Sequence, residues 1–346
     1  MYSRKDIILV VDYHAENTEV RWFNCGSGEE RCLNIPTTRA GVLRLVEKAV
    51  VEATQVGGQV IWIMESTTGW ARIRELIGSR VEFVMANVLQ MPLPPKAYRR
   101  KSDKIDTGRM LREFVNGSLP RSYQADSWWR EVRRLVDSRQ DLVERQTAVK
   151  NWIVHFLHHE TWYDRQGLWT QKGMRRLHSL KLSPSDRMML DLKLQELDEL
   201  AQRRERMEAA MQGVYEQWPQ AQRVDEVRGI GMVTAVSILA HIGPIERFPT
   251  AEDLISYAGL APGHRQSDQS SHNGKIGGGG TDSHLRYLLI ESMQWVCQIP
   301  RYRDAYERAS AKHGKNIARI IVARMLLRSL FKMLKDQVRF NQVSAA

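Results

Sequence analysis

The stretch DIILVVDYH, residues 6–14, carries the strongest local structural signal in the chain. Isoleucine, leucine and valine follow one another without a break and then give way to Asp12, Tyr13 and His14. A short apolar run bounded by polar residues predicts a β-strand that is buried on both faces. A carboxylate therefore stands at the end of a predicted buried strand.

The segments that follow extend this strand into a recognisable order of elements. Residues 19–35 alternate around the turn CGSGEE and predict a hairpin, and residues 36–58 have the apolar spacing and terminal glycines of a helix. A strand, a helix, a strand and a helix are predicted next, at residues 59–66, 69–80, 81–91 and 104–117. Three strands followed by helix, strand, helix, strand and helix is the order of the ribonuclease-H-like fold.

Composition restricts the class of protein. The chain has 346 residues, with 51 Lys and Arg against 40 Asp and Glu, and its net charge of +11 favours a polyanionic partner such as nucleic acid. Three cysteines, Cys25, Cys32 and Cys297, form neither an even disulfide set nor a CxxC pair, so we expect a reduced, cytoplasmic protein. The N-terminal apolar run is too short for a signal peptide. No stretch approaches the ~18 apolar residues of a membrane helix, so we expect a soluble chain.

The pattern after residue 125 is helical. Residues 127–159 and 183–219 have apolar residues at helical spacing. This pattern predicts a short antiparallel coiled coil, and the alternatives are a plain two-helix hairpin packed inside one chain and a contact between copies. RGIG, at residues 228–231, precedes a helix-forming run and resembles a helix-hairpin-helix element, whose N–H groups can hold a phosphate. We therefore expect an α/β catalytic domain, a long-helix region and a mostly helical C-terminal domain, at residues 1–125, 126–218 and 219–346.

Four carboxylates fall where the predicted fold brings strand and helix ends together. Asp12 and Glu65 terminate apolar runs, and the pair Asp103 and Asp106 shares one face at the start of a helix. Burying such groups without a partner is costly, and Mg²⁺ prefers carboxylate oxygens. Two ions roughly 3.5–4 Å apart are the usual arrangement for phosphodiester cleavage. Each acid taken alone is better explained as an ordinary charge at a strand end or helix start, but the ordered set of four is not.

Two further segments bear on nucleic-acid chemistry. Small and polar residues dominate residues 263–283, which predicts a flexible loop, and this loop contains Ser267, Ser270 and Ser271. Residues 312–335 predict a basic amphipathic helix that packs on a core and presents Lys and Arg to phosphate, with a membrane-surface helix as the alternative.

The chain resembles the DEDD transposases of insertion sequences, which are relatives of the Piv and MooV DNA invertases. The resemblance covers essentially the whole chain and rests on six segments in order: VVDYH, IMEST, SDKIDTGRML, RGIG, YAGLAPGHRQSD and HLRYLL. It implies a RuvC-like N-terminal domain, a coiled-coil region and a C-terminal transposase domain. It also implies four metal-binding acids, which are Asp12, Glu65, Asp103 and Asp106.

The same resemblance implies that Ser267, a few residues past the GLxP turn, is a nucleophile. Asp268 stands where glycine is usual in the family, and Ser270 and Ser271 are the alternatives. The implied protein is a bacterial recombinase, nucleoid-associated when active, that acts as a dimer or tetramer. It would use Mg²⁺, or Mn²⁺ in its place, to cleave and exchange donor and target DNA through a covalent serine–DNA intermediate. Some members of the family are guided by a non-coding bridge RNA.

Two other functions fit the same residues. A RuvC-like junction nuclease would use the acids with water as the nucleophile, and a non-catalytic nucleic-acid-binding protein would use the acids only structurally. A DnaQ-like exonuclease fits less well, because its first strand usually carries DxE, whereas Tyr13 and His14 follow Asp12 here.

Overall fold

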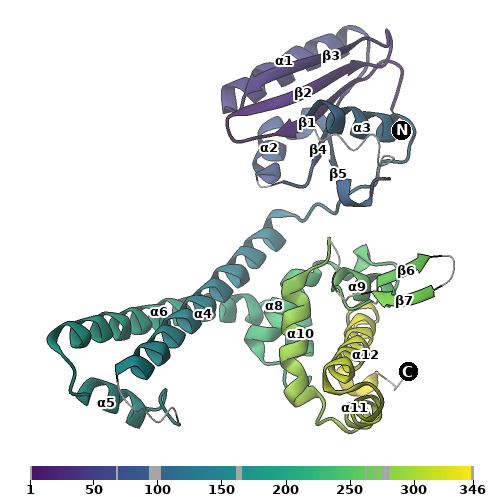
Figure 1. Ribbon diagram of the computed structural model, residues 1–346. Coiled ribbons are helices and arrows are strands. Elements are labelled where there is room, and N and C mark those ends of the chain that lie inside the picture. The colour runs from purple at the N-terminus through teal and green to yellow at the C-terminus, as the bar shows by residue number, and fades with distance from the viewer. Residues whose placement is uncertain are drawn as a thin grey trace. The chain divides into compact units, whose positions relative to one another are not determined.

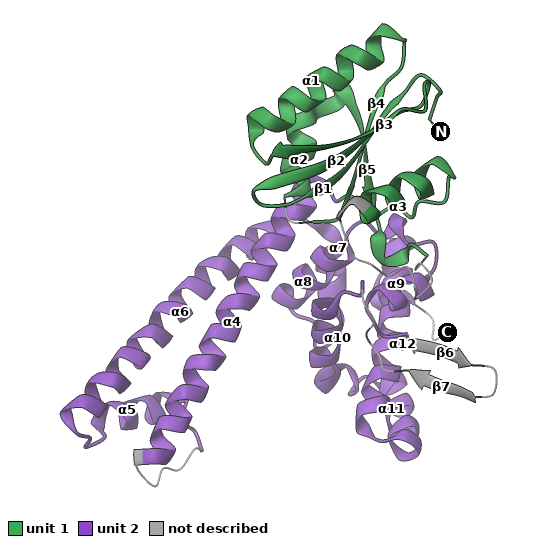
Figure 2. Cartoon of the chain, turned by 45° about the horizontal axis from the view of Figure 1, so that its top comes forward, with its two compact units in different colours: residues 1–124 green, residues 125–346 purple. Residues whose placement is uncertain are grey.

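The computed structural model describes residues 2–67, 69–92, 103–160, 166–261, 263–267, 270–274, 277 and 280–343. At residues 103, 104, 160, 263–267 and 270–274 the description extends to the backbone only. The chain forms two compact units, unit 1 (Met1–Gln124) and unit 2 (Ala125–Ala346), which are coloured separately in Figure 2.

Unit 1 is built on a five-stranded mixed sheet with the order β3-β2-β1-β4-β5 (Figure 1). The strands are β1 (Ile7–Tyr13), β2 (Asn17–Asn24), β3 (Glu30–Pro36), β4 (Val60–Glu65) and β5 (Val81–Ala86). β1 to β3 form an antiparallel meander, whereas β4 and β5 continue the sheet in parallel with β1. The order of elements predicted from the sequence is confirmed. The last strand is shorter than predicted, because the chain turns into a 3-10 helix at Val88–Gln90.

Helices cover both faces of this sheet. They are α1 (Arg39–Gln55), α2 (Trp70–Ile77) and α3 (Asp103–Val115). Successive residues of β1 point to opposite faces. Ile7, Leu9 and Val11 therefore pack in one apolar cluster with residues of α1 and α2. Ile8 and Val10 pack in a second cluster with residues of α3. This double burial explains the unbroken apolar run of β1.

Two long helices form an arm of unit 2 (Figure 1). They are α4 (Ser127–Glu160) and α6 (Pro184–Glu216), and the short α5 (Gln171–Ser179) lies between them in the chain. Leucine, valine and isoleucine residues of α4 and α6 share one apolar cluster, and Arg139 contacts Glu208 at 2.7 Å. The two helices therefore pair within one chain, which is one of the alternatives that the sequence left open.

The remaining helices of unit 2 surround a single large core. They are α7 (Pro219–Asp225), α8 (Met232–Ile242), α9 (Ala251–Tyr257), α10 (Ser283–Val296), α11 (Pro300–His313) and α12 (Lys315–Lys335). The apolar face of α12 is buried in this core through residues such as Val322, Leu326 and Leu330. That face is therefore not free to lie on a membrane surface. None of the described helices has the length and apolar character needed to cross a membrane.

The segment between α7 and α8 has the tight turn that RGIG predicted. Gly229 has φ +93°, and a Cβ built there would lie 2.4 Å from the Cβ of Trp295. Only glycine fits this position, because it combines a left-handed backbone with close contact.

The prediction of a flexible loop over residues 263–283 is wrong for part of that segment. β6 (Gly263–Ser267) and β7 (Ser270–Gly274) pair as an antiparallel hairpin. Gly, Ser and His have little preference for strands, so the composition of the segment did not predict the hairpin. The two strands pair through backbone hydrogen bonds, which do not depend on side-chain type.

Candidate functional site

Asp12 and Glu65 lie side by side at the ends of two central strands. The parallel register of β1 and β4 pairs Val11 with Met64, so Asp12 and Glu65 occupy the next position along each strand. Because residues alternate between faces, both belong to the face that α3 covers. The sheet therefore brings together two acids that are 53 positions apart in the sequence.

The orientation of α3 brings its start to the same edge of the sheet. Phe114, near the end of α3, contacts Tyr2, which precedes β1, with ring centroids 6.0 Å apart. Thr107, near the start of α3, accepts a hydrogen bond from Arg21 Nε at 3.2 Å, and Arg21 lies opposite Val10. α3 therefore runs against the direction of β1 and begins beside the strand end that carries the carboxylate.

Asp106 precedes Thr107 and so lies at this edge. Its Oδ1 is 3.5 Å from Arg109 Nη1. Asp103 is the first residue of α3, one turn earlier on the same helix face, and its side chain lies outside the described residues. On the sheet side, Oδ2 of Asp12 lies 3.4 Å from His14 Nε2. The backbone thus directs all four predicted acids to one edge of unit 1.

A fifth acid, Glu19, was not singled out in the sequence. It lies directly opposite Asp12 in the antiparallel pairing of β1 and β2, and so on the same face. Its Oε1 is buried and has no hydrogen-bond partner. In the alternating strand EVRWFN a glutamate is typical of a solvent-facing position, so no local signal marked it.

This edge has the chemistry of a divalent-metal site. Its donors are carboxylate oxygens, the ligands that Mg²⁺ and Mn²⁺ prefer. Oε1 of Glu19, which lies opposite Asp12 in the sheet, is buried without a hydrogen-bond partner, and a nearby cation would offset the cost of burying it. Among the described residues, only Asp137, His241 and His284 form a set of three whose ligand atoms all lie within 4.8 Å of one another.

The candidate serines lie in unit 2, at the closed end of the β6–β7 hairpin. Ser267 pairs with Ser270, and Ser271 pairs with Gln266. Their side chains, and the whole of Asp268, lie outside the described residues. The choice of Ser267 over its two neighbours therefore stays a prediction.

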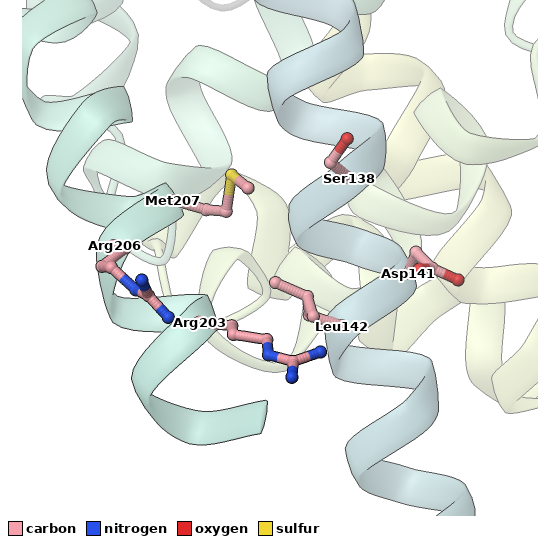
Figure 3. A pocket seen from close by; sticks show the side chains of 6 residues that line it. All are labelled: Ser138, Asp141, Leu142, Arg203, Arg206 and Met207. Atoms are coloured by element: carbon pink, nitrogen blue, oxygen red, sulfur yellow. The ribbon is translucent and has the colours of Figure 1, made fainter. Parts of the chain in front are cut away.

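A separate pocket lies between α4 and α6 (Figure 3). Leu142 and Met207 point into the space between the helices, and two arginines of α6 lie beside them. The remaining lining residues are Ser138 and Asp141 of α4. A single carboxylate and two arginines suit contact with an anion better than metal-dependent cleavage.

Two transposase families match the chain. Residues 11–160 match a model described as Transposase, of the DEDD type from IS110, and residues 221–309 match the Transposase IS116/IS110/IS902 family.

Three proteins illustrate the similarity to known relatives. The IS110 uncharacterized 43.6 kDa protein of Streptomyces coelicolor is 31% identical over 138 residues, which is 39% of this chain and 34% of that protein. The putative transposase y4qE of Sinorhizobium fredii is 25% identical over 303 residues, or 86% of this chain and 70% of the relative. The pilin gene-inverting protein of Moraxella bovis is 33% identical over 118 residues, or 34% and 36%. The alignments with the Streptomyces and Moraxella proteins therefore span only about a third of each relative.

Proposed function

We propose that this chain, which belongs to the IS110 family of transposases, is a DNA recombinase that cleaves and rejoins strands with divalent metal and a serine nucleophile. The observation that carries the proposal is the gathering of Asp12, Glu65 and Asp106, with the backbone of Asp103, at one edge of the unit 1 sheet. The strand order around this edge supports a ribonuclease-H-like, RuvC-like catalytic domain.

The acids would hold the metal, and the neighbouring residues would orient them. Asp12, Glu65, Asp103 and Asp106 would bind Mg²⁺, as one ion or a pair, with Mn²⁺ as a substitute. The bound metal would polarise the scissile phosphate and offset its developing negative charge. Glu19 adds negative charge behind Asp12 and so strengthens the attraction of the edge for cations.

The serine would act as a nucleophile in a step that conserves the phosphodiester. Ser267 Oγ forms a bond to phosphorus while the bond from phosphorus to a deoxyribose oxygen breaks. The serine proton passes to water or to a carboxylate at the acid edge, and the released oxygen takes up a proton as a free hydroxyl. The hydroxyl of the exchanged strand reverses the step and frees the serine. No external energy source is required, because the phosphoserine link retains the energy of the original bond.

The charge of the protein fits nucleic-acid partners. α12 presents Arg319, Arg328, Lys332 and Lys335 on its exposed side, and the chain carries +11 overall. Donor and target DNA would be held mainly through their phosphates. A bridge RNA would select the target by base pairing while the protein reads backbone and shape. Sequencing of RNA that copurifies with the full chain tests this part, and random cellular fragments in place of one discrete species would contradict it.

Capture of a covalent adduct tests the reaction itself. The full chain, incubated with Mg²⁺ and end-labelled DNA carrying its own element end, should yield labelled protein that survives denaturing electrophoresis. Ser267→Ala should abolish the adduct while DNA binding persists, because only one hydroxyl is removed. Ser270→Ala and Ser271→Ala are the matched controls and should retain it.

The other outcomes discriminate between mechanisms. Loss of the adduct in Ser270→Ala or Ser271→Ala alone would assign the nucleophile to that serine in place of Ser267. Cleavage that leaves free 5′-phosphate ends and no adduct would make water the nucleophile, and the protein a RuvC-like nuclease.

A further inference from the structure

Three helices of unit 2 bring an aspartate and two histidines together. Asp137 comes from α4 and His241 from α8, and His284 comes from the first turn of α10. Asp137 Oδ1 lies 3.3 Å from His241 Nε2 and 3.5 Å from His284 Nδ1. All three ligand atoms lie within 4.8 Å of one another.

The tautomer of His241 is fixed by its other ring nitrogen. His241 Nδ1 lies 2.8 Å from Asp282 Oδ2. The same carboxylate accepts hydrogen bonds from Tyr257 Oη at 3.1 Å and from the backbone N–H of Leu285 at 2.9 Å, as an ionised carboxylate does. An ionised carboxylate only accepts, so Nδ1 carries the hydrogen and donates it. In the neutral ring the lone pair of Nε2 therefore faces Asp137.

Nε2 of His241 is buried and unsatisfied. Only 6% of the His241 side chain is exposed, and Nε2 has no hydrogen-bond partner despite the carboxylate oxygen 3.3 Å away. A lone pair that faces an anionic oxygen is repelled unless a cation lies between them. A proton on Nε2 would compete with a metal ion for the same place.

The spacing of the donors matches a tetrahedral metal ion. An ion about 2.0–2.1 Å from each ligand separates two tetrahedral ligand atoms by roughly 3.3–3.4 Å. The two distances from Asp137 Oδ1, 3.3 and 3.5 Å, have this size. Two imidazoles and one carboxylate, with a fourth position left for water, are ligands that Zn²⁺ accepts readily and Mg²⁺ does not.

The surroundings supply the outer hydrogen bonds that metal sites use. Asp282 Oδ2 also accepts from Tyr257 Oη at 3.1 Å, and Asp282 Oδ1 accepts from the backbone N–H of Leu285 at 2.9 Å. A carboxylate that holds the far nitrogen of a ligating histidine fixes its ring and raises its basicity. The ring of His241 is thus held in place for a ligand at Nε2.

We propose that Asp137, His241 and His284 bind a Zn²⁺ ion, with Asp282 as the carboxylate that orients His241. The site is independent of the proposed recombinase chemistry, because it uses none of the acids of unit 1. The ion joins α4, α8 and the start of α10. Asp282 lies at the C-terminal end of residues 263–283, the segment that carries the candidate serines, and His284 follows it on α10. The ion would therefore fix this end of the segment to the helical core.

Zinc titration of the full, untagged chain tests the site. Protein stripped with a chelator is titrated with Zn²⁺ in competition with a chromophoric indicator. One equivalent should bind with a Kd below about 1 μM, and millimolar Mg²⁺ should not displace it. Co²⁺ in place of Zn²⁺ should give the intense visible absorption of a four-coordinate ion.

Variants separate this site from other metal-binding groups. His284→Ala and Asp137→Ala change less buried residues than His241, and each should weaken Zn²⁺ binding by about 100-fold or more and abolish the Co²⁺ bands. His313→Ala, an exposed histidine at the end of α11, and Asp12→Ala in unit 1 should change neither. Circular dichroism checks that each variant keeps its helical content. Absence of a tight equivalent, or equal affinity in His284→Ala and Asp137→Ala, would overturn the proposal.

Discussion

Two clusters of polar side chains differ in the elements that carry them and in their donor atoms. One is the acid edge of unit 1, and the other is the Asp137–His241–His284 cluster of unit 2. The first gathers carboxylates at strand and helix ends, and its proposed ligands are carboxylate oxygens. The second lies among three helices and offers one oxygen and two nitrogens. Hard cations select the first set of donors and borderline transition metals select the second. One chain can therefore hold two kinds of ion without exchanging them.

The two clusters also differ in how their charges are balanced. In unit 2, Asp282 receives hydrogen bonds from His241, Tyr257 and the backbone of Leu285. In unit 1, Glu19 lies opposite Asp12, and its buried Oε1 receives none. The helical cluster is thus arranged before any ligand arrives, whereas one buried oxygen of Glu19 is left without a hydrogen-bond partner. We infer from this difference that the acid edge serves catalysis and the helical cluster serves structure.

Removing an acid should produce the largest effect. Asp12→Ala, Glu65→Ala, Asp103→Ala or Asp106→Ala should lower strand cleavage by about 1,000-fold or more, because each would deprive the metal of a ligand at the reacting phosphate. Zn²⁺ binding in unit 2 should not change. Cleavage of labelled DNA and zinc titration of the same preparations measure both.

The choice of metal provides a second check on these acids. Stripped protein should regain cleavage with Mg²⁺ or Mn²⁺ but not with Ca²⁺, whose larger radius and looser geometry align the phosphate poorly. Normal recombination by any two of the four variants would show that the acids do not hold the catalytic metal.

Substitution of Glu19 should lower cleavage less than substitution of the four acids does, and it should increase stability rather than decrease it. Glu19→Gln should lower cleavage by roughly 10- to 100-fold, as loss of a supporting group around a metal does. It should also raise the free energy of unfolding by about 0.2–1 kcal/mol, because like charges directly opposite in a sheet repel. Single-turnover cleavage and urea denaturation measure the two effects.

Glu82→Gln is the matched control, because Glu82 is an exposed glutamate on β5. It should change neither quantity. Lower stability in Glu19→Gln would mean that the carboxylate has a structural partner. The two clusters would then differ less in how their carboxylates are hydrogen-bonded.

Some of these residues could be predicted from the sequence and others could not, and the difference has physical reasons. Asp12 and Glu65 end apolar runs, where a carboxylate is conspicuous because it is costly to bury. Glu19 fits the ordinary alternation of a strand, and only the register of β1 with β2 gives it significance. His241 lies in an apolar helix, and its partners are 104 positions before it and 43 after it.

Sites assembled from distant helices leave no local pattern, so only the packing of unit 2 shows the histidine cluster. The β6–β7 hairpin was missed for a related reason. Its residues have little intrinsic preference for strands, and the pairing is made by the backbone.

The smallest expected effect concerns the hydrogen bonds that hold the end of α8, which carries His241. Arg133 of α4 donates to the carbonyl of His241 at 2.7 Å and to that of Ala240 at 3.2 Å, at the end of α8 where helix carbonyls lack partners. Arg133→Ala should lower the free energy of unfolding by about 1.5–3 kcal/mol, the range for hydrogen bonds from a charged donor. Arg134→Ala, an exposed neighbour on the same helix, should stay within about 0.5 kcal/mol.

Urea denaturation of zinc-free protein measures this difference as a shift of the midpoint without a change of slope. If Arg133→Ala is as stable as Arg134→Ala, water satisfies the α8 carbonyls as well as the guanidinium does. The position of His241 would then depend on Asp282 and on Tyr257, whose hydroxyl donates to the carbonyl of His241 at 3.1 Å, and α4 would contribute to the cluster only through Asp137. If the loss is observed, α4 both supplies a ligand and fixes the helix that carries the opposing one. That double role is what a site arranged in advance of its ion requires.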